Sequence, residues 1–464
     1  MIIVNPEFHR YLWLNFSPIR LIVPPIVLGL LFYVLAAQPD EFPWQARLFK
    51  PALFIYFVVM FLWGSYEAAS AAVSDLGKKT WDFLKMSSLA PWSLTIGKLF
   101  GATSYVWYIG LILLAVIGLS YGAALDTVKF QYIREVAPTP VNLLIYLLLA
   151  TISGHTAALF MGTHGLQLKK QGIAASFIGG FLVSGFVFSI TVGFNLQSLV
   201  KEPSEIFWHT LSVNQDVFLI GSILFLLFWM MVASQRTFRE ELQYKNAPIV
   251  LVLFLATFSF YISGYLDNNR YYATLDAELK LVSKIYLSFL IILFFTYLAT
   301  FKDATDLARY KRWIYAWKAR EWRHFFENTP GWAGCVLLLV PAYIFLILHA
   351  GVVDVPARIW QPIFSFSNLA FISALSLFVL RDGLVYHAVL LGKIERHKMF
   401  WIFLYLFSAY ILLPFLASLG GEAHIAAFFY PIGDMSFVSA CLPVFMQCFL
   451  AAIGLGYIVK SLRA

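Results

Sequence analysis

The chain has 464 residues, of which 61% are hydrophobic and only 12% are charged, and its formal net charge is +8. Soluble domains carry about 25% charged residues, so this composition excludes an ordinary soluble core. The basic excess does not indicate nucleic acid, because Lys and Arg are spread among loops between apolar runs, where they orient membrane proteins. The cysteines lie in apolar runs without CxxC spacing, so we expect neither a metal site nor a disulfide framework: Cys335, Cys441 and Cys448.

About twelve apolar runs are long enough to cross a bilayer as helices. In the first half they cover residues 21–37, 52–73, 99–121, 141–161, 172–193 and 217–233. In the second half they cover residues 249–265, 285–300, 333–349, 363–380, 401–419 and 437–459. Several are close to the lower length limit, so the count carries a margin of one or two. Because lipid offers exposed backbone no hydrogen-bond partner, the predicted fold class is an all-α integral membrane protein.

The distribution of basic residues orients these spans. With the amino terminus inside, about 24 of the 33 Lys and Arg residues face the cytoplasm and about 9 face the exterior. This bias predicts that both termini are cytoplasmic. We expect a multi-pass protein of the plasma membrane, specifically the bacterial inner membrane.

The loop lengths indicate an internal repeat. Division near Asn246 leaves residues 1–246 and 247–464 with six predicted spans each, and a long basic loop follows the second span of each half, at residues 74–98 and 302–332. Two parallel six-helix pseudo-repeats would place a pathway between them. Residue identity between the halves is weak, so chance placement of the loops stays an alternative.

Residues 77–99 read GKKTWDFLKMSSLAPWSLTIGKL and are the most informative segment. Its first part can form a short interfacial helix with Trp81 and Leu84 on one side. Pro91 would end that helix, Ser93 would cap the next one, and Lys98 would lie where the third span enters the bilayer. The alternative is an ordinary basic loop whose lysines only set the topology.

This segment resembles the cytoplasmic loop of permeases in the type-2 exporter class of ATP-binding cassette (ABC) transporters. The family pattern is Gly-Thr-x-Asp/Glu-x-Leu, then Ser-Pro-Leu-Ser-Pro, then Gly-Lys-Leu, and Ser88 and Ala90 depart from it by replacing a Pro and a Ser. The resemblance covers about 23 residues of this loop, and residues 5–18 also resemble the interfacial helix before the first span of such permeases. It implies that residues 80–91 form a coupling helix that docks on an ATPase. The residues carried over as ATPase-coupling are Thr80, Trp81, Asp82, Leu84, Ser87, Pro91, Gly97 and Lys98.

If the repeat holds, the basic loop at residues 302–332 supplies a second coupling element. The residues proposed for it are Tyr310, Arg312, Ile314 and Trp317. Tyr310, Ile314 and Trp317 share one helical face and basic residues are displaced from it, which predicts a basic amphipathic helix. The alternative is a helix anchored on anionic lipid headgroups.

Intramembrane polar residues are scarce in this reading. Glu67 is the acidic residue placed clearly inside a predicted span, so it is a candidate proton carrier or substrate contact. The alternative is a structural role with a neighbouring partner. In the fifth span, Gly179, Gly180 and Gly185 are expected to permit close helix contact.

The sequence contains no GxxxxGK[ST] pattern, so the chain itself is not expected to be an enzyme or to bind a cofactor. ATP and magnesium would be bound by a separate ABC-type ATPase subunit, expected in two copies. The leading hypothesis is therefore the membrane-spanning permease subunit of an ATP-driven exporter, with an unidentified, amphipathic or lipid-like substrate. The alternative is an ion-coupled secondary transporter with two pseudo-symmetric halves, and a homodimer stays open.

Overall fold

The computed structural model describes residues 5–39, 42–77, 84–87, 89–128, 137–167, 173–197, 205–268, 276–302, 307–349, 369–392, 398–419, 428–429 and 436–461. Within these ranges, eleven helices are long and apolar enough to cross a membrane. The protein is therefore a helical multi-pass membrane protein. The predicted run at residues 401–419 is also helical, but its apolar part, Phe400–Leu416, is shorter than the other eleven.

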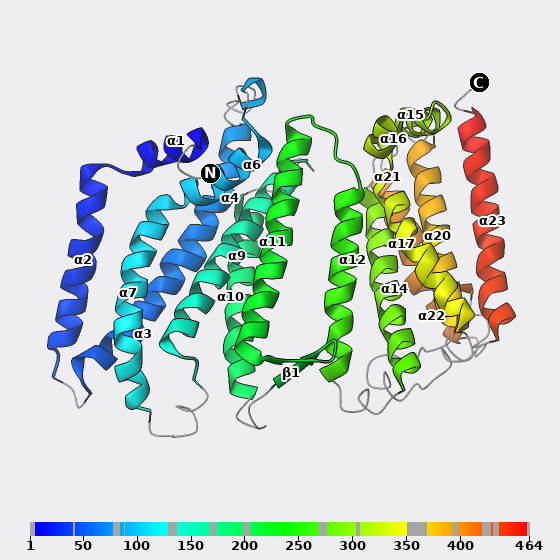
Figure 1. Ribbon diagram of the computed structural model, residues 1–464. Coiled ribbons are helices and arrows are strands. Elements are labelled where there is room, and N and C mark those ends of the chain that lie inside the picture. The colour runs from blue at the N-terminus through cyan, green and yellow to red at the C-terminus, as the bar shows by residue number, and fades with distance from the viewer. Residues whose placement is uncertain are drawn as a thin grey trace. The chain divides into compact units, whose positions relative to one another are not determined.

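The chain divides into two compact units, and unit 1 comprises residues 1–206 and 212–246. Its helices, coloured blue to green in Figure 1, are α1 (Pro6–Asn15), α2 (Pro18–Ala37), α3 (Trp44–Tyr56), α4 (Gly64–Gly77), α6 (Pro91–Ile96), α7 (Ser104–Asp126), α9 (Pro140–Gln167), α10 (Ile173–Gln197) and α11 (Gln215–Glu241). The π-helical turn η1 (Phe57–Trp63) joins α3 to α4, and the π-helical turn η2 (Gly97–Ala102) follows α6. The strands β1 (Glu205–Trp208) and β2 (Leu211–Asn214) pair just before α11.

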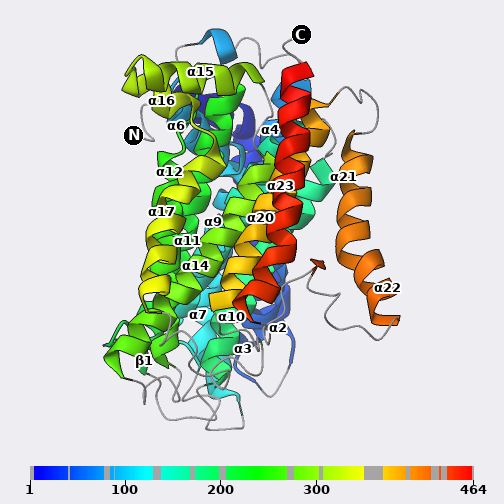
Figure 2. The ribbon, with the colours of Figure 1, turned by 90° about the vertical axis from the view of Figure 1, so that its right-hand side faces the viewer.

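Unit 2 comprises residues 207–211 and 247–464. Its helices are α12 (Ile249–Ser263), η3 (Gly264–Asn268), α14 (Ala277–Lys302), α15 (Leu307–Lys318), α16 (Trp322–Asn328), α17 (Gly331–Leu348), α20 (Leu369–Leu391), α21 (Lys398–Phe407), α22 (Leu413–Leu419) and α23 (Phe437–Ser461). The π-helical turn η4 (Ser408–Leu412) joins α21 to α22. Figure 2 shows α15 lying across the ends of the long helices of this unit.

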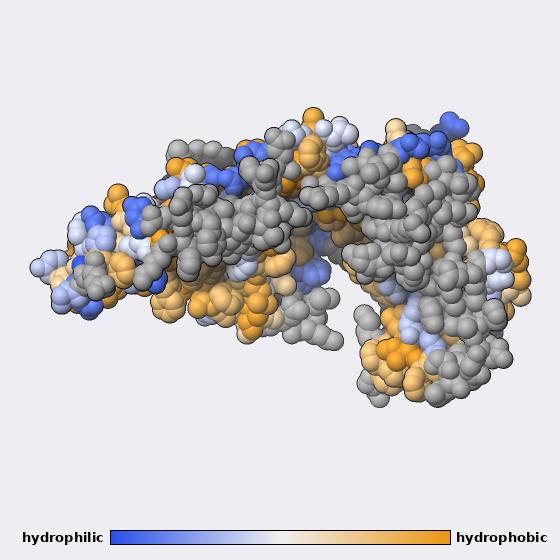
Figure 3. Space-filling view, turned by 90° about the horizontal axis from the view of Figure 1, so that it is seen from below, coloured by the Kyte–Doolittle hydropathy of each residue, from blue (hydrophilic) through white to orange (hydrophobic). Residues whose placement is uncertain are grey.

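The core of unit 1 forms around α9, the most buried of its spanning helices, and includes Tyr56, Met60, Leu113 and Leu147. The outward flanks are apolar instead of polar: only 17% of the span of α2 is buried, and its exposed side chains are mostly Ile, Leu and Val. Figure 3 shows hydrophobic residues in orange on the flanks of each unit. Apolar flanks are what lipid contact requires.

Small residues let α9 and α10 cross closely. A Cβ atom added to Gly180 would lie 2.5 Å from the Ala158 Cβ and 2.7 Å from the Gly154 carbonyl oxygen. A Cβ atom on Gly179 would collide with Met161, whereas one on Gly185 would meet nothing within 4 Å. The predicted packing role is therefore confirmed for Gly179 and Gly180 and wrong for Gly185, which lies away from the crossing.

One predicted span ends too early. The tenth apolar run stops at Leu380, but α20 is a continuous helix from Leu369 to Leu391. Its charged pair, Arg381 and Asp382, interrupts the hydropathy signal without interrupting the helix, because both side chains are buried and bonded within unit 2. The charges that ended the prediction therefore lie within the span.

Replacement of Gly180 by Ala is expected to destabilise unit 1, because the added methyl group has no space beside the Gly154 carbonyl oxygen. Such overpacking costs about 1–3 kcal/mol and should lower the thermal unfolding temperature of the purified protein. Gly185→Ala is the matched control in the same helix. Equal unfolding temperatures for the two variants would contradict the close crossing.

Candidate functional site

Helix α1 is fixed by its N-cap residue, Asn5. The Asn5 side chain accepts hydrogen bonds from the backbone N–H groups of Glu7 (3.0 Å) and Phe8 (3.3 Å), which caps the helix. The same side chain donates to the Ser93 carbonyl oxygen (2.8 Å) and accepts from the Ser93 hydroxyl (2.9 Å). At the other end, the Asn15 amide donates to the carbonyl oxygens of Gly101 and Ala102, both at 3.2 Å. Both ends of α1 are thus attached to the segment formed by α6 and η2.

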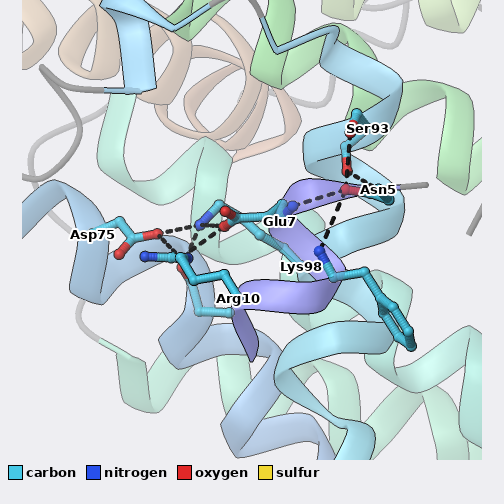
Figure 4. Close-up of polar contacts among 8 residues, drawn as sticks. Asn5, Glu7, Arg10, Asp75, Ser93 and Lys98 are labelled. Atoms are coloured by element: carbon cyan, nitrogen blue, oxygen red, sulfur yellow. Dashed lines mark hydrogen bonds and ion pairs between the residues drawn. The ribbon is translucent and has the colours of Figure 1, made fainter. Parts of the chain in front are cut away.

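A buried charge network lies beneath α1, and we call Glu7, Arg10, Asp75 and Lys98 the α1 charge network (Figure 4). The Lys98 ammonium group is fully buried and contacts the carboxylate of Asp75, the Glu7 Oε1 at 3.2 Å and the Ala71 carbonyl oxygen at 3.2 Å. The Arg10 Nη2 lies 2.7 Å from Glu7 Oε1 and 3.1 Å from Asp75 Oδ2. Two cations and two carboxylates share their contacts, so the network is electrically neutral.

The electrostatics keep Lys98 charged. Burial on its own would lower its pKa, but the neighbouring Tyr11 and the carboxylates of Glu7 and Asp75 outweigh burial and raise the pKa above the ordinary lysine value. Since the folded pKa is raised, the stabilising contribution is complete below the ordinary lysine pKa and is lost only as the pH rises through the folded value. The network is therefore intact at neutral pH.

Each residue of the Gly97-Lys98-Leu99 sequence has its own structural role. A Cβ atom on Gly97 would lie 2.7 Å from the Glu7 Cβ, so glycine lets α1 lie directly on η2. Lys98 supplies the buried cation, and Leu99 packs with Phe238 of α11 and Leu84 of the preceding loop. The sequence prediction placed Lys98 at the membrane interface, whereas the structure buries it among carboxylates.

The described part of the coupling segment is short. Thr80, Trp81 and Asp82 lie outside the described residues. Leu84 is half-buried against the cluster that contains Leu99, and the Ser87 hydroxyl donates to the Leu84 carbonyl oxygen at 2.7 Å.

Pro91 and Ser93 occupy different positions from those expected. Pro91 is the first residue of α6, where its missing N–H costs nothing, and Ala90 is the N-cap residue. The predicted capping role of Ser93 is wrong, because its hydroxyl is used to hold Asn5 instead.

The second predicted coupling region contains two short helices, α15 and α16. Tyr310 is half-buried, whereas Arg312, Ile314 and Trp317 are exposed. The Trp317 ring contacts the Trp322 ring of α16 edge-on, with centroids 5.7 Å apart. The expected common apolar face is therefore divided: Tyr310 faces the spanning helices, and Trp317 packs against α16.

Glu67 has a partner on its own helical turn. The Trp63 indole Nε1 donates to the Glu67 Oε1 at 2.9 Å, four residues earlier in the chain. This bond supports the structural alternative, since the carboxylate is satisfied within its own helix. The expectation that Glu67 carries protons or contacts substrate stays a prediction.

Sequence reasoning missed a second charged centre, in α20. Asp382 is 1% exposed and accepts hydrogen bonds from three tyrosine hydroxyls: Tyr297 (3.1 Å), Tyr405 (2.6 Å) and Tyr410 (2.5 Å). The Arg381 Nε donates to the Asp382 Oδ1 at 2.9 Å, and its Nη1 donates to the Gln447 Oε1 at 2.8 Å. We call this cluster the Asp382 centre. It connects α20 to α14, to the α21–η4 helix and to α23.

Only part of the Asp382 centre can be recognised in the sequence. The adjacent Arg-Asp pair is visible in the sequence, but it lies at the edge of the apolar run, where charged residues are usually solvated. The three tyrosines lie 23, 28 and 85 positions away from Asp382 in the chain, so their convergence requires the tertiary structure. Within the described ranges, no group of three or more His, Cys, Asp or Glu side chains could hold a metal ion.

Comparison with known proteins adds no identification: no family model, no curated protein and no solved structure matches this chain.

Replacement of Lys98 by Met is expected to destabilise the protein by about 3–5 kcal/mol, because it leaves two buried carboxylates with one partly exposed cation. Thermal unfolding of the purified protein measures the effect. Lys85→Met is the control, since Lys85 is exposed on the neighbouring loop. If both variants unfold at the wild-type temperature, the α1 charge network does not hold α1 in place.

Replacement of Asp382 by Asn is expected to destabilise the protein by a similar amount, about 3–5 kcal/mol, because the buried Arg381 loses its counter-charge. The double variant Arg381→Leu, Asp382→Leu should recover part of that loss, since it removes both buried charges. Asp276→Asn, at an exposed position, serves as the control in the same unfolding assay. A double variant less stable than Asp382→Asn would show that the tyrosine contacts, and not the buried charge, dominate.

Proposed function

We propose that this chain is the membrane-spanning permease subunit of an ATP-driven exporter, energised by a separate ABC-type ATPase and moving an amphipathic or lipid-like substrate. The observation that supports the proposal most directly is the position of the α1 charge network. Asp75 lies near the end of α4, just before the predicted coupling segment, and Ser93 and Lys98 lie just after it. The segment is therefore bracketed on both sides by contacts to α1.

This arrangement suits transmission of force. A push on the segment between α4 and α6 would move α4 and η2, which are joined through Asp75 and Lys98. Helix α1 would move with them, because its Glu7 contacts Lys98 and its Arg10 contacts Asp75. Buried ion pairs are directional and costly to break, so they resist sliding between the helices. Load entering at one loop would thus reach α1, α4 and η2 together.

The exposed surface of the same segment provides a place for docking. Met86 is 76% exposed and Lys85 is also exposed, whereas Leu84 faces the cluster with Leu99. A large exposed apolar side chain beside a lysine has the composition of a small protein-protein contact. In the proposed complex, Met86 would contact the ATPase, and Leu84 would pass the load to the permease.

The Asp382 centre favours one other candidate, an ion-coupled secondary transporter. Ionisable residues inside spanning helices frequently mark ion or proton pathways, and Asp382 is such a residue. However, the Asp382 carboxylate already accepts four hydrogen bonds, which leave it little capacity to bind a transported ion. This saturation supports the permease proposal over the ion-coupled transporter. The two candidates differ in the energy source that drives transport.

Replacement of Met86 by Asp is expected to abolish capture of the ATPase, because it places a charge in the centre of the proposed contact. The measurement is co-purification of the tagged chain with a Walker-A ATPase encoded beside it. Tyr244→Asp, which alters another large exposed side chain of unit 1, is the control and should leave capture unchanged. Leu84→Asp should retain capture but uncouple ATP hydrolysis from transport.

Two outcomes would contradict the permease proposal. One is that the wild-type chain captures no ATPase under any condition. The other is transport in vesicles that collapses with the proton gradient, ignores ATP and is lost in Asp382→Asn protein that still folds. The second outcome would establish the ion-coupled alternative.

A further inference from the structure

The described residues of unit 2 surround a groove of about 1030 Å³. Its lining residues come from α14, α15, α17, α20 and α23. Figure 2 shows α15 lying across the ends of the long helices of this unit. Along α20 the lining extends from Ser373 to Leu391, which corresponds to about 27 Å of helix. This length is close to the roughly 30 Å hydrocarbon thickness of a bilayer.

The walls of the groove offer hydrocarbon contacts and few polar groups. The hydroxyls of Thr296, Thr300 and Ser376 bond carbonyl oxygens of their own helices, at 2.7, 2.9 and 2.6 Å. The Ser373 hydroxyl is paired with the Tyr343 hydroxyl at 2.6 Å. The polar atoms are therefore satisfied internally, and the surface left for a ligand consists mainly of Leu, Val, Ile and Phe side chains.

The end of the groove below α15 is different in character. Tyr310 is bonded to His387 of α20 at 2.9 Å, and the Trp332 indole of α17 donates to the Tyr310 hydroxyl at 3.3 Å. These bonds hold α15 over the groove, and they position the next residue, Lys311, at its mouth. Lys311 is exposed and lines the groove, so a positive charge lies where the apolar walls end.

From this arrangement we propose that the groove binds one anionic glycerophospholipid, with its phosphate on Lys311 and its acyl chains along α17, α20 and α23. Apolar walls alone would not select a ligand in a membrane, because lipid chains gain nothing by leaving other lipid chains. The charge of Lys311 supplies the selection, since basic pockets between spanning helices bind anionic headgroups. The alternative occupant, a transmembrane helix of another protein, would not place an anion beside Lys311 of α15.

The volume is also appropriate. Small-molecule pockets generally occupy about 300–1,000 Å³, and this groove, at about 1030 Å³, has space for a large ligand. The site does not depend on the proposed transport function, because it involves residues of unit 2 alone. A lipid held here would connect α15, which carries the second predicted coupling residues, to the spanning helices.

The experiment uses the full-length protein in nanodiscs that contain phosphatidylglycerol or phosphatidylcholine bearing a diazirine in an acyl chain. After photolysis, mass spectrometry maps labelled peptides. We expect labelling of α17, α20 and α23 lining residues by the phosphatidylglycerol probe, and a reduction of about fivefold in Lys311→Glu, the factor that corresponds to ~1 kcal/mol for one basic side chain. Lys318→Glu, on the same helix but away from the groove, should retain labelling.

A second pair of variants tests the cavity itself. Leu380→Trp fills the groove and should abolish labelling of its walls, whereas Leu404→Trp, on the exposed surface of α21, should not. Unfolding temperatures within a few degrees of wild type establish that these variants fold. Equal labelling by both lipids, unchanged labelling in Lys311→Glu and Leu380→Trp, or crosslinks between two copies of α20 would each overturn the proposal.

Discussion

Lys98 carries a full positive charge in a place from which water is excluded, and the organisation of unit 1 around α1 depends on how that charge is neutralised. Glu7 and Asp75 reach it from α1 and α4, and Arg10 balances the second carboxylate. Because a buried charge without partners would cost several kcal/mol, these contacts hold α1, α4 and η2 together. The position of α1 across η2 is therefore an electrostatic requirement as well as a packing arrangement.

The same constraint applies in unit 2, where Asp382 gathers tyrosines from three segments around one carboxylate. In both centres a π-helical turn supplies a partner, since Lys98 lies in η2 and Tyr410 lies in η4. A π turn adds one residue to a continuous helix and so rotates the following side chains by about 100°. It can aim a polar side chain inward from a helix whose regular face would point to lipid.

The two units thus combine buried polar joints with apolar outer surfaces. In unit 1 the joint lies beside the segment that we propose as the docking site of an ATPase. In unit 2 the joint lies in the middle of α20, and the groove runs along a neighbouring face of the same helix.

The sequence by itself determined that this is a multi-pass helical membrane protein, because the length and apolarity of a span are local properties that need no partner. It also singled out Gly97 and Lys98, although it placed Lys98 at the interface. Only the tertiary structure decided that Lys98 is buried, that α20 continues through Arg381 and Asp382, and that Ser93 holds Asn5. Each of these features depends on side chains from distant segments. In the sequence alone, a charged residue predicts the end of a span, because the counter-charge that allows it to be buried is not visible.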